Sequence, residues 1–391
     1  MNINEEAIKL HRKLNGKIEI KLKEAIDSPE KLSLLYSPGV AQPCLEIAED
    51  PQKAYEYTFK KNTILIVSDG SAVLGLGNIK GLASLPVMEG KAALFKQFGD
   101  VNCLPIVLDT QDTEEIITTI KNIAIGFGGI NLEDISTPRC FEIEKRLDEM
   151  LDIPVFHDDQ HGTAIVCCAG LINALKVVDK KINEVEIVIN GLGSAGIAIT
   201  KLLVNYGFKN FSLCDINGLL YQGTLMEHDL DNLVDFINEK KQLPGLPLQE
   251  VLKDKDVFIG VSAANLIDDK VAKSMNKDAI IFAMANPNPE ISFENAQKAG
   301  VKILATGRSD YPNQINNVLV FPGIFKGTLA VQAQSINTQM KIAAVNALAS
   351  IIKDEELKAD YIIPSPFDKR VVDTISQAVQ VAAIKSNINK I

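Results

Sequence analysis

The chain has 391 residues, 46% of them hydrophobic and 23% charged, so at about 150 residues per domain it is long enough for two domains with substantial cores. Its formal charge of −10, from 50 acidic and 40 basic residues, argues against nucleic acid and anionic membranes as main partners. None of the six cysteines forms a C-x-x-C pair, and we expect all six to be reduced thiols.

The N-terminal segment, residues 1–23, mixes acidic and basic side chains and lacks the apolar core of a secretion signal. The longest apolar stretch, residues 164–178, is interrupted by Asn173 and Lys176. It is shorter than the roughly 18 uninterrupted residues that a membrane span needs. We therefore expect a cytoplasmic protein without a membrane partner.

Two different patterns divide the chain. Residues 1–155 mix helical and strand-like pieces, with strands predicted at 64–67 and 104–108, and we predict an N-terminal α/β domain there. From about residue 162 a long helix of small residues precedes alternating strands and helices, with strands predicted at 186–189, 211–214, 257–261, 280–284 and 302–305. This alternation predicts a doubly wound, Rossmann-type parallel sheet within residues 156–391, followed by C-terminal helices at 327–353 and 366–385.

A glycine-rich turn follows the strand predicted at 186–189 and opens a helix. Its residues include Gly191, Gly193, Ser194, Ala195 and Gly196, a G-x-G-x-x-G match. The strand–turn–helix context makes this weak motif specific for a dinucleotide. The first glycine permits the tight turn, the second lets the backbone approach the pyrophosphate, and the third allows close helix–strand packing.

Asp215 ends the next predicted strand, 24 residues after Gly191. An acidic residue about 20 positions beyond the first glycine binds the ribose hydroxyls of NAD. It would repel the 2′-phosphate of NADP, and no cation follows immediately to compensate. The sequence therefore predicts NAD, and NADP stays open as the alternative because other loops could supply a lysine or arginine.

Carboxylates gather just before the dinucleotide domain. The segment F-H-D-D-Q-H-G-T at 156–163 contains Asp158 and Asp159, and a second acidic pair, Glu133 and Asp134, follows a glycine-rich stretch. We expect a strand end or turn where one acid faces a site and the other supports it. Carboxylate oxygens suit a hard cation such as Mg²⁺ or Mn²⁺. The two histidines of the segment could hold Zn²⁺ on a helix, but no third nitrogen or sulfur ligand is evident, so we favour the oxygen-ligand site.

At this point the sequence resembles the malic enzymes, in their short bacterial-type form, nearly from end to end. The resemblance rests on separated motifs in the right order: Y-S-P-G-V-A at 36–41, S-D-G at 68–70, G-L-G-N at 75–78, V-M-E-G-K at 87–91, N-L-E-D at 131–134, the segment at 156–163, the glycine turn, A-N-P at 285–287, N-N at 316–317 and F-P-G at 321–323.

The resemblance implies roles for individual residues. Glu133, Asp134 and Asp159 would hold the metal. Lys91 would be the general base, Tyr36 the general acid, and Asp158 the supporting acid near the lysine. Asn286 and Asn317 would contact the substrate, and Asn286 would also touch the nicotinamide. The larger relatives carry a malate-binding arginine after their Asp-Gly, whereas Ser71 and Ala72 follow here, so the substrate carboxylate needs another partner.

We therefore expect a two-domain α/β enzyme that oxidatively decarboxylates (S)-malate to pyruvate and CO₂ with reduction of NAD. Lys91 would act as a base only if partly neutral, which desolvation and a nearby cation both favour. The resemblance also implies a homodimer. The rivals are a malolactic enzyme that releases lactate, against which the short chain argues, a non-catalytic dinucleotide-sensing protein, and a hydroxy-acid dehydrogenase that yields oxaloacetate.

Overall fold

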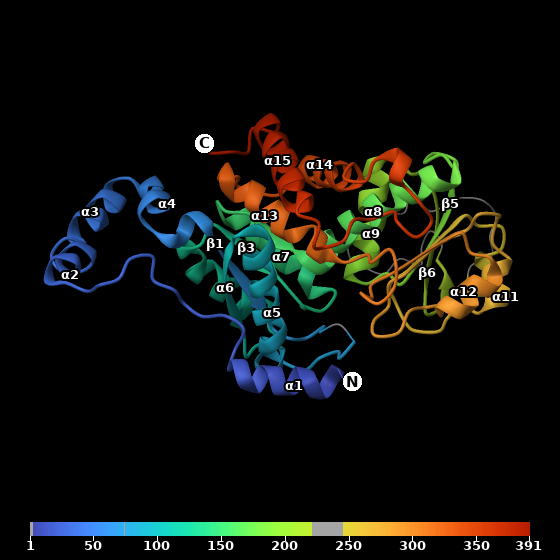
Figure 1. Cartoon of the computed structure of the whole chain (residues 1–391), viewed down its shortest axis with the longest axis horizontal. Coiled ribbons are helices and arrows are strands. Elements are labelled where there is room, and N and C mark those ends of the chain that lie inside the picture. Colours follow the sequence, from blue (N-terminus) through green and yellow to red (C-terminus); the bar gives the residue numbers. More distant parts are fainter. Residues whose placement is uncertain (1–2, 74, 221–244) are drawn as a thin grey trace.

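Two β-sheets, connected by one long helix, form the framework of the molecule (Figure 1). The computed structural model describes residues 3–73, 75–220 and 245–391. Both sheets are built from parallel strands with helices on their two faces, apart from one antiparallel edge strand in the second sheet. This confirms the predicted α/β class with a Rossmann-type second sheet.

The first sheet has four parallel strands in the order β2-β1-β3-β4. The central strand β1 is buried along its whole length, as expected for a sheet covered on both faces. One face packs on α5 and the other on α6 and α7. The elements are β1 (Thr63–Ser68), α5 (Gly81–Gly99), β2 (Asn102–Val107), α6 (Thr113–Ile123), β3 (Gly129–Leu132), α7 (Arg139–Met150) and β4 (Val155–His157).

Among the described residues the second sheet has six strands in the order β10-β9-β8-β5-β6-β7, of which only β7 is antiparallel. The chain leaves β5 on one side to form β6 and returns on the other to form β8, so the strand order reverses beside β5. Ligands of doubly wound sheets bind at such a switch point. The elements are β5 (Glu186–Asn190), α9 (Ser194–Tyr206), β6 (Asn210–Asp215), β7 (Gly218–Leu219), α10 (Leu248–Val251), β8 (Val257–Gly260), α11 (Asp269–Lys273), β9 (Ile280–Ala283), α12 (Phe293–Ala299) and β10 (Ile303–Thr306).

Helix α8 (Asp158–Val178) runs from β4 into the second half of the chain and lies in the main core. It is long and apolar enough to cross a membrane by length and composition, but 72% of its most apolar stretch is buried inside the molecule. Its side chains pack against residues of both sheets and of the C-terminal helices. The apolar character of this helix is therefore explained by core packing on all sides.

Three C-terminal helices, α13 (Phe321–Ala330), α14 (Thr338–Ala349) and α15 (Arg370–Lys385), complete the main core. The helix predicted over 327–353 is broken, because the chain turns at Gln332 (φ +47°) and restarts where the Asn337 side chain accepts from the Met340 amide. Helix α13 returns to the first half of the chain, where Phe321 packs 4.5 Å from Phe95 between ring centroids. The boundary predicted at 155/156 falls inside β4 and stays a prediction.

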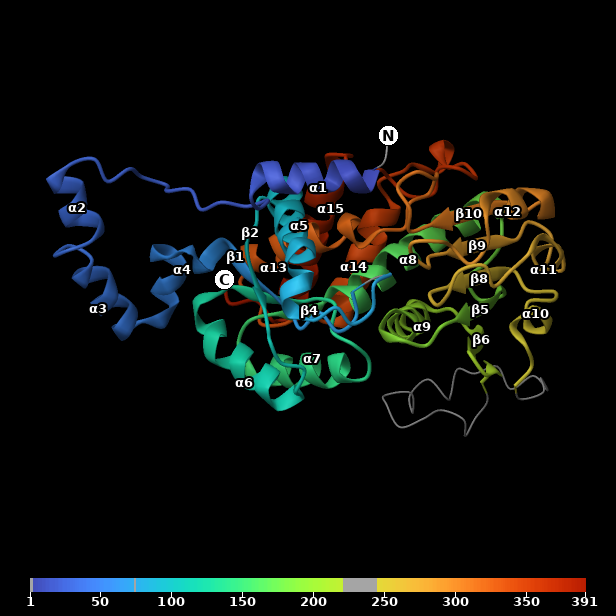
Figure 2. The same ribbon diagram turned by 90° about the horizontal axis from the view of Figure 1, so that it is seen from below.

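The N-terminal helices α1 (Ile3–Leu14), α2 (Pro29–Leu35) and α3 (Ala41–Glu49) contain no buried residue among their described positions. Helix α1 lies beside α5, where the Lys17 amide donates to Glu89 (3.1 Å). Helices α2 and α3 lie at the end of an arm that projects away from both sheets in the two views, and α4 (Ala54–Tyr57) leads back to β1 (Figures 1 and 2).

Candidate active site

The two acidic pairs of the sequence meet at the carboxyl edge of the first sheet. Glu133 and Asp134 directly follow β3, and Asp158 and Asp159 open α8 directly after β4. Strands β3 and β4 are parallel neighbours, with Leu132 opposite His157. The pairs therefore lie side by side, as the prediction of a strand-end site requires.

Lys91 projects from the buried face of α5 into this acidic cluster. Its Nζ donates to Asp158 Oδ2 at 2.6 Å and lies 2.8 Å from Glu133 Oε1. The side chains of all three residues are nearly inaccessible to solvent, and the ammonium lies 4.3 Å from the centre of the Phe321 ring. The predicted base and its predicted supporting acid are thus brought together.

Burial and charge act in opposite directions on these groups. Burial lowers the pKa of Lys91, but Asp158, Glu133 and Asp159 raise it well above its ordinary value, so the side chain is an ammonium in this arrangement. Burial raises the pKa of Asp158 to about 8 although Lys91 opposes the shift, and burial also raises the pKa of Glu133 and of Asp159. One ammonium does not balance these buried carboxyls, so the site favours a further cation.

Glu133, Asp134 and Asp159 fit a divalent cation by geometry. Each offers one carboxylate oxygen, and the three oxygens lie within 4.8 Å of one another. Oxygens on one such ion lie no farther apart than twice the metal–oxygen distance, about 4–5 Å. The donor set consists only of oxygens, as Mg²⁺ and Mn²⁺ prefer.

Local contacts hold the carboxylates in place. The Asn131 side-chain amide donates to Glu133 Oε2 (2.8 Å), and the Asp134 backbone amide donates to Asp159 Oδ2 (2.9 Å). At Gly162, one turn into α8, a Cβ would lie 1.9 Å from Asp158 Oδ1 and 3.1 Å from the Cβ of Asn317. Glycine is therefore required there, and its absent side chain brings the predicted substrate ligand Asn317 next to Asp158.

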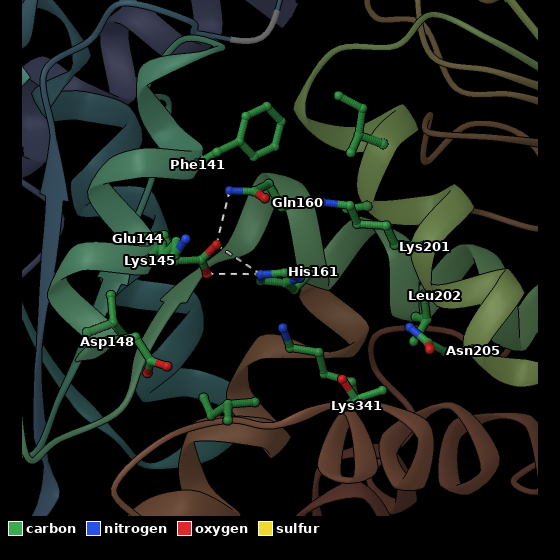
Figure 3. A pocket seen from close by; sticks show the side chains of 15 residues that line it. Phe141, Glu144, Lys145, Asp148, Gln160, His161, Lys201, Leu202, Asn205 and Lys341 are labelled. Carbon is green, nitrogen blue, oxygen red and sulfur yellow. Dashed lines mark hydrogen bonds and ion pairs between the residues drawn. The ribbon is translucent and has the colours of Figure 1, made fainter. Parts of the chain in front are cut away.

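Glu144, which the sequence did not single out, supports the start of α8. Its carboxylate accepts from the His157 amide (2.8 Å) and from the Gln160 side chain (3.2 Å), and it lies 3.0 Å from His161 Nε2 (Figure 3). Glu144, Gln160 and His161 line a cavity of about 330 Å³ between α7, α8, α9 and α14. Only His161 of the histidine pair lies on the helix, because His157 precedes it, so the pair does not form the helical zinc motif.

Arg139 and Asp69, which the sequence did not single out, form an ion pair that holds the loop after β1 in place. The Arg139 guanidinium lies 2.9 Å from Asp69 Oδ2 and donates to Ser71 Oγ (2.9 Å). The Ala72 amide in turn donates to the Asp134 carbonyl (2.9 Å). The only hint in the sequence was that no arginine follows Asp69-Gly70. In the structure Arg139 reaches the same loop from α7.

The backbone conformation and the close packing of the glycine turn agree with the reasons for which glycines were predicted there. Gly191 has φ +103°, and a Cβ there would lie 2.8 Å from Ser262. A Cβ at Gly196 would lie 1.8 Å from the Gly191 carbonyl oxygen, whereas one at Gly193 meets nothing within 4 Å. Ser194 and Ala195 begin α9, so its N-terminal amides face the open space at the switch point.

Asp215 is the last residue of β6, the strand next to β5, and its Oδ1 accepts from the Asn217 amide (2.7 Å). Asn286 is exposed in the loop after β9, and a Cβ on Gly75 of the first domain would lie 3.2 Å from its carbonyl oxygen. Buried Glu290, also unpredicted, holds this loop by accepting from the Ala285 amide (3.0 Å). Asn286 therefore lies where the two halves approach each other.

Tyr36 is the one predicted catalytic residue that is not assembled with the others. It ends α2 on the projecting arm, and 67% of its surface is exposed. Lys91, in contrast, lies inside the body of the molecule, and both views separate α2 from α5 (Figures 1 and 2).

Family models match both halves of the chain. Residues 15–148 match the model described as "Malic enzyme, N-terminal domain", and residues 160–388 match "Malic enzyme, NAD binding domain". The first match contains Lys91 with Glu133 and Asp134, and the second contains the glycine turn. The acidic pair that opens α8 lies at the junction of the two matched regions.

Known malic enzymes are similar to this chain over its full length. A Bacillus subtilis protein named "Bifunctional malic/malolactic enzyme" is 52% identical, covering 100% of this chain and 95% of its own length. A Geobacillus stearothermophilus "NAD-dependent malic enzyme" is also 52% identical, covering 99% of this chain and 80% of its own. The crystal structure of a malic enzyme from Pyrococcus horikoshii superposes with a TM-score of 0.92 at 48% identity, over 99% of this chain and 92% of that one.

Proposed function

This chain belongs to the malic enzyme family, and we propose that it oxidatively decarboxylates (S)-malate to pyruvate and CO₂ while reducing NAD. The observation that carries the proposal is the buried Lys91 ammonium between Asp158 and Glu133, beside three carboxylate oxygens that fit one cation. A base next to a cation is what removal of the C2 hydroxyl proton requires.

Glu133, Asp134 and Asp159 would hold Mg²⁺ or Mn²⁺. When bound, the cation acts as a Lewis acid toward the substrate's oxygens and stabilises the negative charge that develops when CO₂ departs. The Asn131 side chain and the Asp134 amide hold the carboxylates of Glu133 and Asp159 in orientation. These contacts keep the negatively charged ligands together despite their mutual repulsion.

Lys91 would take the C2 hydroxyl proton, and a bound nicotinamide would accept the C2 hydride. Asp158 and Glu133 stabilise the ammonium form of the lysine, and a cation held by Glu133, Asp134 and Asp159 would instead favour the neutral amine that accepts the proton. Asp158 stays behind as the hydrogen-bond partner that keeps Nζ in position. Asn317, next to Asp158, and Asn286, between the two halves, would contact malate.

Tyr36 then supplies the proton that C3 needs. The C3–C4 bond breaks, CO₂ leaves, and the phenol O–H transfers its proton to C3 of the resulting enolate to give pyruvate. Solvent returns the proton to the phenolate, and Lys91 releases the C2 hydroxyl proton to solvent, so protons and electrons balance with the reduced cofactor.

NAD would lie across the carboxyl ends of β5 and β8. Gly191, Gly193 and Gly196 leave room for the pyrophosphate, and Ser194 and Ala195 present the amides that begin α9. Asp215 at the end of β6 would accept from the ribose hydroxyls, which favours NAD over NADP. We also propose a cytoplasmic homodimer.

A malolactic activity is the second candidate, because the Bacillus subtilis relative is named for both reactions. That relative has nearly the same length as this chain, so length does not argue against lactate formation. The distinguishing assay follows reduced nicotinamide with malate, Mn²⁺ and either NAD or NADP, and measures pyruvate, lactate and oxaloacetate in the same tube. Pyruvate equal to reduced cofactor, faster with NAD, supports the proposal.

Each rival gives a different product balance in that assay. Lactate without net reduced cofactor indicates the malolactic reaction, and oxaloacetate with reduced cofactor indicates a simple dehydrogenase. Binding of NAD without any turnover indicates the dinucleotide-sensing protein.

A further inference from the structure

The cavity between α7, α8, α9 and α14 has no role in the proposed reaction. Its described lining residues include neither Lys91, nor a predicted metal ligand, nor a residue of the glycine turn. Its volume of about 330 Å³ lies in the range of small-molecule sites. Helix α7 packs on the first sheet, whereas α9 and α14 belong to the second half of the chain, so a molecule in the cavity would contact both halves (Figure 3).

The wall formed by α7 presents two carboxylates. Glu144 and Asp148 lie one turn apart on this helix, and both line the cavity. Glu144 is already engaged by the donors described above. Asp148 accepts from the Val155 backbone but forms no ion pair with a described residue, and its carboxylate points into the cavity (Figure 3). Lys145 also lines this wall and is exposed.

The walls formed by α9 and α14 are basic. Lys201 and Lys341 extend into the cavity from these helices (Figure 3). Lys341 is half-buried, and no described residue forms a hydrogen bond or an ion pair with its ammonium. Burial lowers the pKa of Lys341, although Glu144 and Asp148 oppose this shift. A partly buried ammonium without a partner is unfavourable, so this side of the cavity favours a ligand with a negative charge.

The charges of the cavity disfavour simple ions. An anion beside Lys341 would be repelled by Glu144 and Asp148, and a cation beside Asp148 would be repelled by Lys341 and Lys201. A zwitterion can place each of its charges against the wall of opposite sign. Apolar side chains cover much of the remaining surface, and they are Phe141, Val155, Ile197, Ala198, Leu202 and Ile336.

We propose that this cavity binds a free aliphatic α-amino acid, which acts as an effector of the metal site. The carboxylate of the amino acid pairs with Lys341 near Lys201, its ammonium pairs with Asp148, and its side chain packs on the apolar lining. The ligand therefore connects α7 to α9 and α14. This binding site is separate from the proposed reaction.

Glu144 links the cavity to the metal ligands. Its carboxylate accepts from the His157 amide and from the Gln160 side chain, on either side of Asp158 and Asp159 in the sequence. A ligand that holds α7 in place therefore also restrains the first turn of α8. Because such coupling is reciprocal, the amino acid and Mn²⁺ should strengthen each other's binding. The coupling, but not the binding, rests on the proposed metal site.

Isothermal titration calorimetry on the enzyme without metal or malate tests the binding site. L-Leucine should bind once per chain. Isocaproate lacks the ammonium of leucine and isoamylamine lacks its carboxylate, so each should bind at least about tenfold more weakly, a loss of one charged contact. Absence of leucine binding would overturn the inference. It would also be overturned if isocaproate, isoamylamine or inorganic phosphate bound as tightly as leucine, because a simple ion would then be sufficient.

Two variants locate the ligand. Lys341→Met should weaken leucine binding at least about tenfold and leave isoamylamine unaffected, whereas Asp148→Asn should weaken leucine equally and leave isocaproate unaffected. The matched controls are Lys298→Met and Glu149→Gln, at exposed positions outside the cavity, and they should bind leucine as the wild type does. Leucine binding that both cavity variants leave intact would place the amino acid elsewhere and overturn the inference.

The coupling has its own measurement. Saturating leucine should lower the dissociation constant of Mn²⁺ at least about fivefold in the wild type and leave it unchanged in Lys341→Met. An unchanged constant in the wild type would overturn the effector role. None of these titrations requires turnover of malate. Leucine binding without formation of pyruvate would therefore refute the proposed function alone, and pyruvate formation without leucine binding would refute this inference alone.

Discussion

Lys91 and Asp158, 67 positions apart in the chain, form a buried ion pair with a separation of 2.6 Å. The lysine comes from the inner face of α5 and the aspartate from the first turn of α8, so the pair links the core of the first sheet to the helix that leads to the second. Buried pairs of this kind are costly to break because each partner leaves an uncompensated charge.

Replacing Lys91 should abolish turnover and leave the cofactor site intact. Lys91→Arg keeps a cation beside Asp158 but cannot act as a base, because a guanidinium does not lose its proton in proteins. We expect kcat to fall at least about 100-fold, with NAD affinity by calorimetry near that of the wild type. The control is Lys96→Arg on the exposed side of the same helix. Loss of NAD binding would mean that the lysine belongs to the cofactor site.

Removing a predicted metal ligand should weaken Mn²⁺ binding directly. Asp159→Asn deletes one of three charged oxygens in the cluster, and we expect the dissociation constant for Mn²⁺, from electron paramagnetic resonance of free ion, to rise at least about tenfold. The matched control is Asp152→Asn, an exposed acid a few residues earlier. An unchanged affinity would favour the dinucleotide-sensing protein over an enzyme.

The glycine turn allows a paired test of binding against folding. A methyl group at residue 193 meets nothing within 4 Å, so Gly193→Ala should keep the wild-type melting temperature while weakening NAD binding about tenfold or more, because it occupies the space of the pyrophosphate. A methyl group at residue 196 would overlap the Gly191 carbonyl, so Gly196→Ala should also lower the melting temperature. Wild-type NAD affinity in Gly193→Ala would exclude this turn as the cofactor site.

Acid should reveal the contribution of Glu144 to stability. Burial raises the pKa of this carboxyl, but His161, Lys341 and His157 outweigh burial and lower it to about 2, below its ordinary 4.5. The folded state therefore favours the carboxylate, and this stabilisation is full above about pH 4.5 and is lost as the pH falls towards 2. A shift of this size corresponds to about 3 kcal/mol.

The experiment compares Glu144→Gln with wild type by thermal unfolding between pH 6 and pH 3. Wild type should be more stable at pH 6, and the difference should shrink as the pH falls. Glu142→Gln, at a 57% exposed side chain on the same helix, should show no such trend. A difference that stays constant with pH would show that Glu144 stabilises α8 by packing and not by charge.

Local patterns were sufficient to predict most of the fold. The apolar runs near Ile64 and Leu104 are strands of the first sheet, and the strand, glycine turn and helix around Gly191 appear as predicted. These elements follow from short-range periodicity and turn chemistry. The break between α13 and α14 was missed because an isolated apolar run carries no signal for a turn that tertiary packing selects.

The site was harder to predict, because its contacts join distant segments. The pairing of Asp158 with Lys91 could be expected only through the family resemblance. The local sequence around a helix lysine or a turn aspartate contains no signal for the distant residue that it contacts. In the sequence alone, Glu144 and Arg139 cannot be told apart from ordinary surface charges of an amphipathic helix. Both became recognisable only when the fold placed them against α8 and the loop after β1.

The packing of α13 against α5 limits how much of the protein can fold while it is being synthesised. Phe95 packs against both Phe321 and Phe325, so the core around the Lys91 helix contains side chains that a ribosome adds more than 200 residues later. The first half of the chain therefore cannot complete its core while it is being translated, although domains usually fold in the order in which they emerge. A chain cut short before α13 would keep its glycine turn and all four site carboxylates, yet it would lack the Phe321 ring against which Lys91 packs.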